Sequence, residues 1–111
     1  AWKELQQLVP CQCSNMSRVK EALGLEEIRK TGFSASSFNI NFACAFHVDK
    51  GDYLGMAPIA YFRKGQQTGG LLLLPQLGLA IECRNRSIVF LPSKVLVHGV
   101  TELDLIEPGS Y

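Results

Sequence analysis

The sequence lacks long apolar runs and lacks an excess of charge of one sign. Runs such as residues 71–74 are far too short to cross a bilayer, so we expect no membrane partner. Lysine and arginine number 11 against 10 acidic residues. A strongly basic footprint of the kind that binds nucleic acid is therefore absent. Nothing in the sequence indicates a protein partner either.

Cysteine patterns that would organise the fold are also missing. Cys11 and Cys13 form a C-x-C pair, but no second pair completes a zinc site, and Cys44 falls on the apolar face of a predicted strand. This spacing favours reduced cysteines. We therefore expect an intracellular protein, with the nucleus as a candidate location.

The composition is sufficient for one small domain, spanning residues 1–111, with a hydrophobic core. Of the 111 residues, 47% are hydrophobic. Residues 1–32 are predicted to form a helical N-terminal support, and residues 37–111 contain short strand-like runs. The fold class predicted is α+β and mainly β. Because the chain begins without methionine and stops abruptly after residues 108–111, we expect it to be a piece of a longer protein.

Two helices are predicted in the N-terminal part. Apolar residues at helical spacing predict a helix over residues 2–9, which Pro10 ends. After a polar turn at residues 14–15, a second helix is predicted over residues 17–30, and Gly32 can end it. These helices need a surface to cover, and we expect that surface to be the apolar face of the first strand.

That first strand is predicted over residues 38–49 and has two unlike faces. Read at period two, one face is apolar and mostly large, and the other is small or polar. The apolar face consists of Phe38, Ile40, Phe42, Cys44, Phe46 and Val48. The other face consists of Asn39, Asn41, Ala43, Ala45, His47 and Asp49. Small residues followed by an imidazole and a carboxylate suit the wall of a cavity that holds a ligand.

Later strands are short and separated by turn signals, which suggests a sandwich or a barrel. They are predicted at residues 59–62, 71–74, 77–83, 88–91 and 94–98. The glycine-rich residues 64–70 are predicted to form a turn.

A metal site is predicted from the only two histidines in the chain. His47 opens an H-x-D pair with Asp49, and an extended backbone points both side chains the same way. His98 ends the last predicted strand, and such strand ends can meet in an antiparallel barrel. Two imidazoles and one carboxylate leave adjacent positions of a metal open, which suits non-haem iron(II) oxygenases. An H-x-D pair alone is weak evidence, because a histidine near a strand end is usually only a hydrogen-bonded polar residue.

Three ordered blocks of the sequence resemble a known family. They are H-V-D-K-G-D at residues 47–52, T-G-G-L-L-L-L-P-Q-L-G-L at residues 68–79 and V-L-V-H-G at residues 95–99. These blocks are similar to those of the 2-oxoglutarate/iron(II) dioxygenases of the TET/JBP class, in particular its fungal and transposon-associated members. The resemblance covers residues 38–100 or so.

The resemblance implies a double-stranded β-helix, or jelly roll, that is truncated at its C-terminal end. It implies Fe(II) held by His47, Asp49 and His98, with 2-oxoglutarate as the co-substrate. The implied reaction oxidises a C–H bond and converts 2-oxoglutarate to succinate and carbon dioxide. The implied substrate is the methyl group of 5-methylcytosine or thymine in DNA, so the resemblance suggests nucleic acid as a partner.

Co-substrate binding is where the sequence departs from the family pattern. Such enzymes hold the distal carboxylate of 2-oxoglutarate with an arginine on the strand after the second histidine, and no arginine or lysine follows His98. Either that arginine lies beyond Tyr111, as we expect, or the anchor is missing. Weak substitutes are Arg63, Arg84 and Lys94. Asn41 and Tyr61 are candidate co-substrate contacts, with structural capping and a place in the core as their alternative roles.

Other functions remain open. A jelly-roll metal-binding protein of cupin type would lack 2-oxoglutarate chemistry, although cupins usually bring more histidines to their metal. A non-catalytic remnant or binding module is compatible with the absent arginine. A protein or small-molecule hydroxylase could use the same scaffold. Iron- and 2-oxoglutarate-dependent production of succinate separates the oxygenase from the two non-oxygenase classes.

Overall fold

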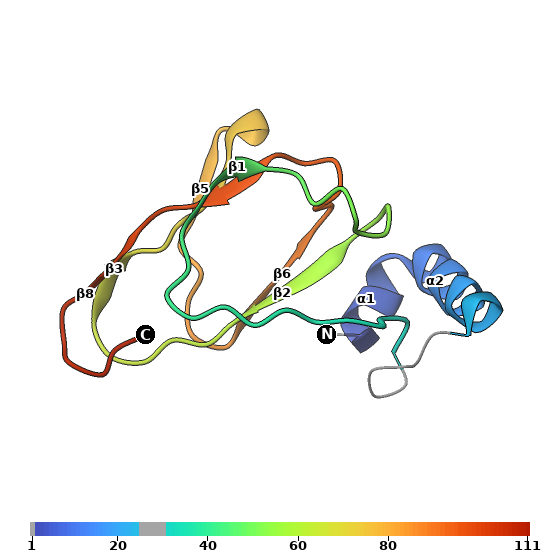
Figure 1. The fold of residues 1–111 in the computed structure, drawn as a ribbon, viewed down its shortest axis with the longest axis horizontal. Coiled ribbons are helices and arrows are strands. Elements are labelled where there is room, and N and C mark those ends of the chain that lie inside the picture. The colour runs from blue at the N-terminus through green and yellow to red at the C-terminus, as the bar shows by residue number, and fades with distance from the viewer. Residues whose placement is uncertain (1, 25–30) are drawn as a thin grey trace. The chain divides into compact units, whose positions relative to one another are not determined.

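The computed structural model describes residues 2–24 and 31–111, and the chain divides into two compact units, Ala1–Phe38 and Asn39–Tyr111. Within the described residues, the first unit contains the α-helices and the second contains the strands (Figure 1). This is the α+β composition that the sequence predicts. None of the described helices is long and apolar enough to span a membrane.

The first unit contains α1 (Trp2–Leu8) and α2 (Pro10–Leu23). The prediction of the first helix is confirmed. The second helix begins at Pro10, because proline is well tolerated at the first helical position, where its missing N–H would have no partner in any case. The predicted turn at residues 14–15 is therefore wrong. Gly24 ends α2 with a left-handed φ of 66°, and the remainder of the predicted helix, residues 25–30, lies outside the described residues.

Apolar side chains of α1 and α2 are buried in this unit. Leu5 is fully buried, and Cys13 and Met16 are 3% and 6% exposed. The ring of Trp2 meets that of Phe33 edge to face, with centroids 5.4 Å apart. These contacts fix the segment after the helices against α1.

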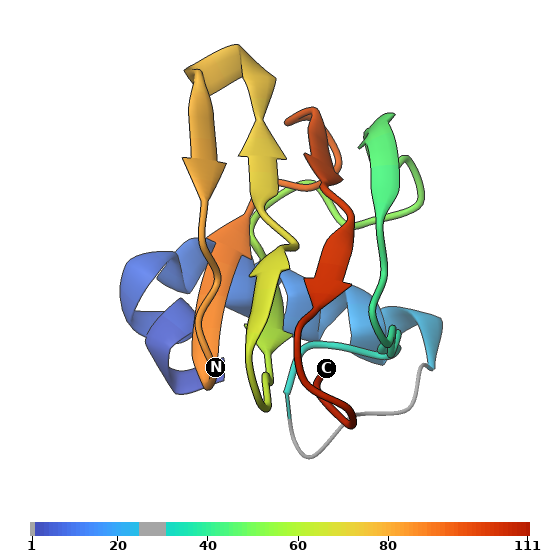
Figure 2. The same ribbon diagram turned by 90° about the vertical axis from the view of Figure 1, so that its left-hand side faces the viewer.

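The second unit consists of eight short strands and one turn of 3₁₀-helix. The strands are β1 (Cys44–His47), β2 (Ala57–Tyr61), β3 (Gln67–Gly69), β4 (Leu72–Leu74), β5 (Leu79–Ile81), β6 (Ser87–Leu91), β7 (His98–Val100) and β8 (Leu103–Leu105), and η1 covers Pro75–Leu77. They form a four-stranded antiparallel sheet in the order β1-β7-β4-β5 and two antiparallel pairs, β2-β6 and β3-β8 (Figure 2).

One hydrophobic core joins the four-stranded sheet to the β2-β6 pair. Its buried members are Leu72, Leu74, Cys83 and Leu91. The partly buried residues packed against them are Ile59, Tyr61, Ile81, Val89, Leu96 and Val100. Most of these residues come from β2, β4, β5, β6 and β7, so the core includes β7, the strand that begins with His98.

The prediction of one strand over residues 38–49 is wrong for its first half. The strand begins only at Cys44, and Asn41 has a left-handed φ of 51°, which breaks the alternation of faces. Phe38 and Ile40 are 92% and 84% exposed. The continuous apolar face that the helices were expected to cover therefore does not exist.

Two further predictions about strands are also wrong. Residues 94–97 form a turn, because the carbonyl of Pro92 accepts hydrogen bonds from the N–H groups of Val95 and Leu96, and His98 begins β7 instead of ending a strand. The predicted turn over residues 64–70 contains β3, which pairs with the unpredicted β8. Gly69 has a φ of 79°, and its missing side chain lets the backbone of Glu102 approach closely.

Candidate metal centre

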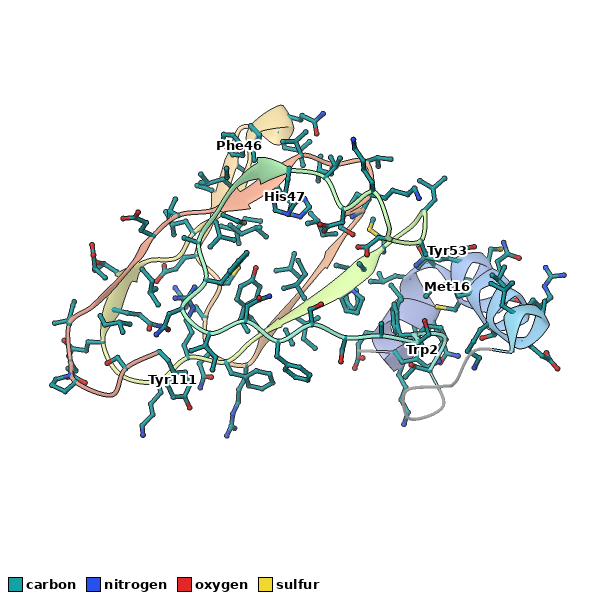
Figure 3. The ribbon with its side chains drawn as sticks, viewed as in Figure 1. Trp2, Met16, Phe46, His47, Tyr53 and Tyr111 are labelled. Carbon is teal, nitrogen blue, oxygen red and sulfur yellow. The ribbon has the colours of Figure 1, made fainter. Side chains whose placement is uncertain are left out.

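Antiparallel pairing of β1 with β7 places the two histidines side by side. His47 is the direct partner of His98 in the register of the two strands. Their ring centroids lie 4.4 Å apart, with the ring planes inclined by 56°. Figure 3 shows the rings of His47 and Phe46 on opposite sides of β1, as alternation along a strand requires.

Asp49 completes the group from the loop that follows β1. Its Oδ1 lies 3.4 Å from Nε2 of His47, and its Oδ2 lies 3.2 Å from Nε2 of His98. Ligand atoms of the three residues all lie within 4.8 Å of one another. The side chain of His98 is only 7% exposed, whereas those of His47 and Asp49 are each 40% exposed. The group is therefore buried on one side and open to small molecules on the other.

Backbone carbonyls determine which nitrogen of each imidazole faces the carboxylate. Nδ1 of His47 lies 2.8 Å from the carbonyl oxygen of Ala45, and Nδ1 of His98 lies 2.8 Å from that of Leu96. A carbonyl only accepts hydrogen bonds, so each Nδ1 donates its proton. In a neutral ring this leaves the lone pair on Nε2, the atom that points at Asp49. Both histidines therefore present a metal-binding nitrogen to the same point.

This donor set fits a metal cation. Two nitrogen lone pairs and a carboxylate that face one another repel unless a positive charge lies between them. A divalent cation bound by both Nε2 atoms and a carboxylate oxygen removes that repulsion, and a proton on either ring would do so only in part. Two imidazoles and one carboxylate on one side of an ion match the ligand set of non-haem iron(II) sites.

The other predicted site residues lie outside this group. Asn41 is exposed and precedes β1, so it does not share a strand face with His47. Tyr61 packs against the hydrophobic core, and burial raises the pKa of its phenol above the usual value, with the nearby Cys83 thiol raising it further. Their predicted contacts with a co-substrate stay predictions.

Two of the basic residues that were considered as substitutes for the missing arginine, Arg63 and Lys94, donate to backbone carbonyls. Nη2 of Arg63 donates to the carbonyl of Gly70 at 2.9 Å. Arg63 and Arg84 line a groove of about 270 Å³ to which none of the three candidate ligands contributes. Nζ of Lys94 donates to two backbone carbonyls of the loop that carries Asp49. That contact was not foreseen, because in the sequence Lys94 is indistinguishable from a solvated surface charge.

Comparison with known proteins agrees with this geometry. The Tet_JBP family model, described as the oxygenase domain of the 2OGFeDO superfamily, matches residues 3–110. The chain belongs to this family. No curated protein and no solved structure gives a match. The Tet_JBP match begins in α1 and ends next to Tyr111, so it includes both units and all three residues of the candidate metal centre.

Proposed function

We propose that this Tet_JBP domain is an Fe(II)/2-oxoglutarate-dependent dioxygenase folded as a double-stranded β-helix. The observation that carries the proposal is the convergence of His47, Asp49 and His98 in a chain of this family. The jelly-roll fold is supported by antiparallel sheets that share one core.

The three side chains would bind iron(II) through the two Nε2 atoms and a carboxylate oxygen. Three protein ligands leave further positions of the metal for the co-substrate and dioxygen. When bound, iron(II) and 2-oxoglutarate would supply hydroxylation of a C–H bond: one atom of dioxygen would enter the product and the other would enter succinate, as 2-oxoglutarate loses carbon dioxide. The carbonyls of Ala45 and Leu96 hold the rings of His47 and His98 in the tautomer that this binding needs.

We propose the methyl group of a pyrimidine in DNA, 5-methylcytosine or thymine, as the substrate. Membership of the TET/JBP family is the support for this choice. The net charge of +1 adds none, because it provides no general affinity for phosphate. A base inside a duplex cannot reach a protein-bound metal, so the target nucleotide would be flipped out of the stack.

The proposal is tested first by anaerobic titration of the protein with iron(II) and 2-oxoglutarate. A weak visible charge-transfer band is expected for the wild type and not for Asp49→Asn, which keeps the size of the side chain and removes its charge. The titration is repeated on the chain extended beyond Tyr111, where we expect the arginine that holds the distal carboxylate. Absence of the band from both wild-type forms would contradict the proposal.

The substrate is tested by adding dioxygen and an oligonucleotide that contains 5-methylcytosine or thymine. Succinate is expected together with an oligonucleotide that is heavier by one oxygen atom, as measured by mass spectrometry. Production of succinate without any change in the oligonucleotide would exclude this substrate and favour a protein or small-molecule hydroxylase. Metal binding without succinate would favour a jelly-roll metal-binding protein.

A further inference from the structure

The turn between β6 and β7 contacts His98 and also the loop that carries Asp49. At its C-terminal end, the carbonyl of Leu96 accepts the hydrogen bond of His98 Nδ1. Next to it, the N–H of Val97 donates to Oε1 of Gln76 at 2.9 Å. The end of the turn that carries His98 is therefore held by a side chain of η1 as well as by the sheet.

At its N-terminal end the same turn holds the loop of Asp49. The carbonyl of Ser93 accepts a hydrogen bond from the N–H of Asp49 at 2.9 Å. The hydroxyl of Ser93 donates to Oδ2 of Asp52. Ser93 is only 2% exposed, so both contacts are buried at the Ser93 end. Both ends of the four-residue loop are therefore attached to one residue.

Lys94 adds a third attachment to this loop. Its Nζ donates to the carbonyls of Lys50 and Asp52, each at 3.0 Å. Within the loop, the N–H of Asp52 donates to the carbonyl of Asp49 at 3.0 Å. The ammonium group thus binds the carbonyls of residues on both sides of Gly51. These hydrogen bonds oppose opening of the loop.

Such contacts matter because Asp49 is the one candidate ligand outside a strand. His47 and His98 are fixed by the pairing of β1 with β7, whereas Asp49 depends on its loop for its position. Residues that hydrogen-bond to metal ligands, or that hold them in place, commonly change metal affinity by about 10- to 100-fold. A ligand that is already in place also loses less conformational freedom when the metal binds.

We propose that Ser93 and Lys94 are positioning residues that hold the carboxylate of Asp49 against the two imidazoles and so prepare the metal site before the ion arrives. This inference rests on the metal centre of the proposed function, and it does not depend on the co-substrate or the substrate. The residues act through the loop of residues 49–52 and do not touch the metal.

The test is binding of cobalt(II), whose visible spectrum reports the arrangement of its ligands. The variants are Ser93→Ala and Lys94→Met, which remove the hydroxyl and the ammonium group, with Lys94→Arg as the conservative replacement. Lys50→Met is the matched control, because it removes one positive charge from the loop of Asp49 itself and keeps the carbonyl that Lys94 contacts. Thermal unfolding without metal checks that each variant is folded.

We expect Ser93→Ala and Lys94→Met to weaken cobalt(II) binding by about tenfold or more and to change its spectrum. Lys94→Arg should recover part of the affinity, and Lys50→Met should bind within about twofold of the wild type. Unchanged affinity and spectrum in the folded Ser93→Ala and Lys94→Met variants would overturn the proposal. An equal loss in Lys50→Met would also overturn it, since charge alone would then explain the effect.

Three other outcomes also have a definite meaning. If Ser93→Ala does not fold, Lys94→Met decides the question, because its hydrogen bonds lie at the surface. If the wild type binds no cobalt(II), the metal centre itself is wrong, and this inference fails with it. If the wild type binds the metal but produces no succinate, only the dioxygenase proposal fails, and the affinities of the variants still test the positioning role.

Discussion

His47 is the cross-strand partner of His98, so the backbone pairing of β1 with β7 sets the distance between the two imidazoles. Cross-strand partners have side chains on the same face of a sheet at a fixed spacing. The 4.4 Å between the ring centroids therefore depends on the sheet as a whole and not only on the two side chains. The first two predictions follow from this dependence.

Divalent metal should stabilise the folded protein. The ligands come from two strands and a loop, so an unfolded chain cannot present them together. At a free metal concentration of about 100 times Kd, the free energy of unfolding should rise by about 2.7 kcal/mol. Thermal unfolding with and without cobalt(II) or iron(II) measures this, and Asp49→Asn should show little of the increase. An equal increase in that variant would mean that the ion binds elsewhere.

Gly99→Ala should disturb the site without touching a ligand. A Cβ at Gly99 would lie 3.0 Å from the carbonyl oxygen of Cys44 and 3.1 Å from Cδ1 of Phe46, so β1 would have to move away from β7. We expect a loss of about 1–3 kcal/mol in stability and weaker metal binding. Gly51→Ala is the control, because nothing lies within 4 Å of its Cβ. Denaturant unfolding that gives equal stabilities for both variants would contradict this account.

Tyr61 should make the protein less stable at high pH. Burial raises the pKa of its phenol in the folded state, and a raised pKa means that its contribution is complete below the unfolded value of about 10 and is lost as the pH rises above it. The melting temperature of Tyr61→Phe should therefore fall less than that of the wild type between about pH 9 and pH 11. Tyr53→Phe, at a 41% exposed position, should behave like the wild type.

Leu72→Ala should be strongly destabilising. Leu72 is 1% exposed and lies at the centre of the core that joins the four-stranded sheet to β2 and β6. Truncation of a buried leucine typically costs about 2–5 kcal/mol, because it removes packing and leaves a cavity. Leu77→Ala, at a 58% exposed position, should cost far less. Denaturant unfolding of the two variants measures the difference, and similar losses would contradict this description of the core.

The candidate ligands could be identified from the sequence more reliably than the strands that carry them. His47, Asp49 and His98 were identifiable because the chain has only two histidines and one of them opens an H-x-D pair. The strand over residues 38–49 was overpredicted, since alternation of apolar residues cannot reveal that Asn41 adopts a left-handed conformation. β3 and β8 were missed because alternation of polar and apolar residues cannot be recognised in strands of only three residues.

Residue patterns alone predicted the mainly β composition, the first helix, the likeness to the TET/JBP class and the three candidate ligands. The folded chain was needed to show that His98 begins β7 opposite His47, and that Ser93 and Lys94 donate hydrogen bonds to, or accept them from, the loop of Asp49. The physical reason is that these contacts join segments far apart along the chain. Period and spacing describe neighbours in sequence, whereas hydrogen bonds to backbone carbonyls of another segment depend on how the strands pair.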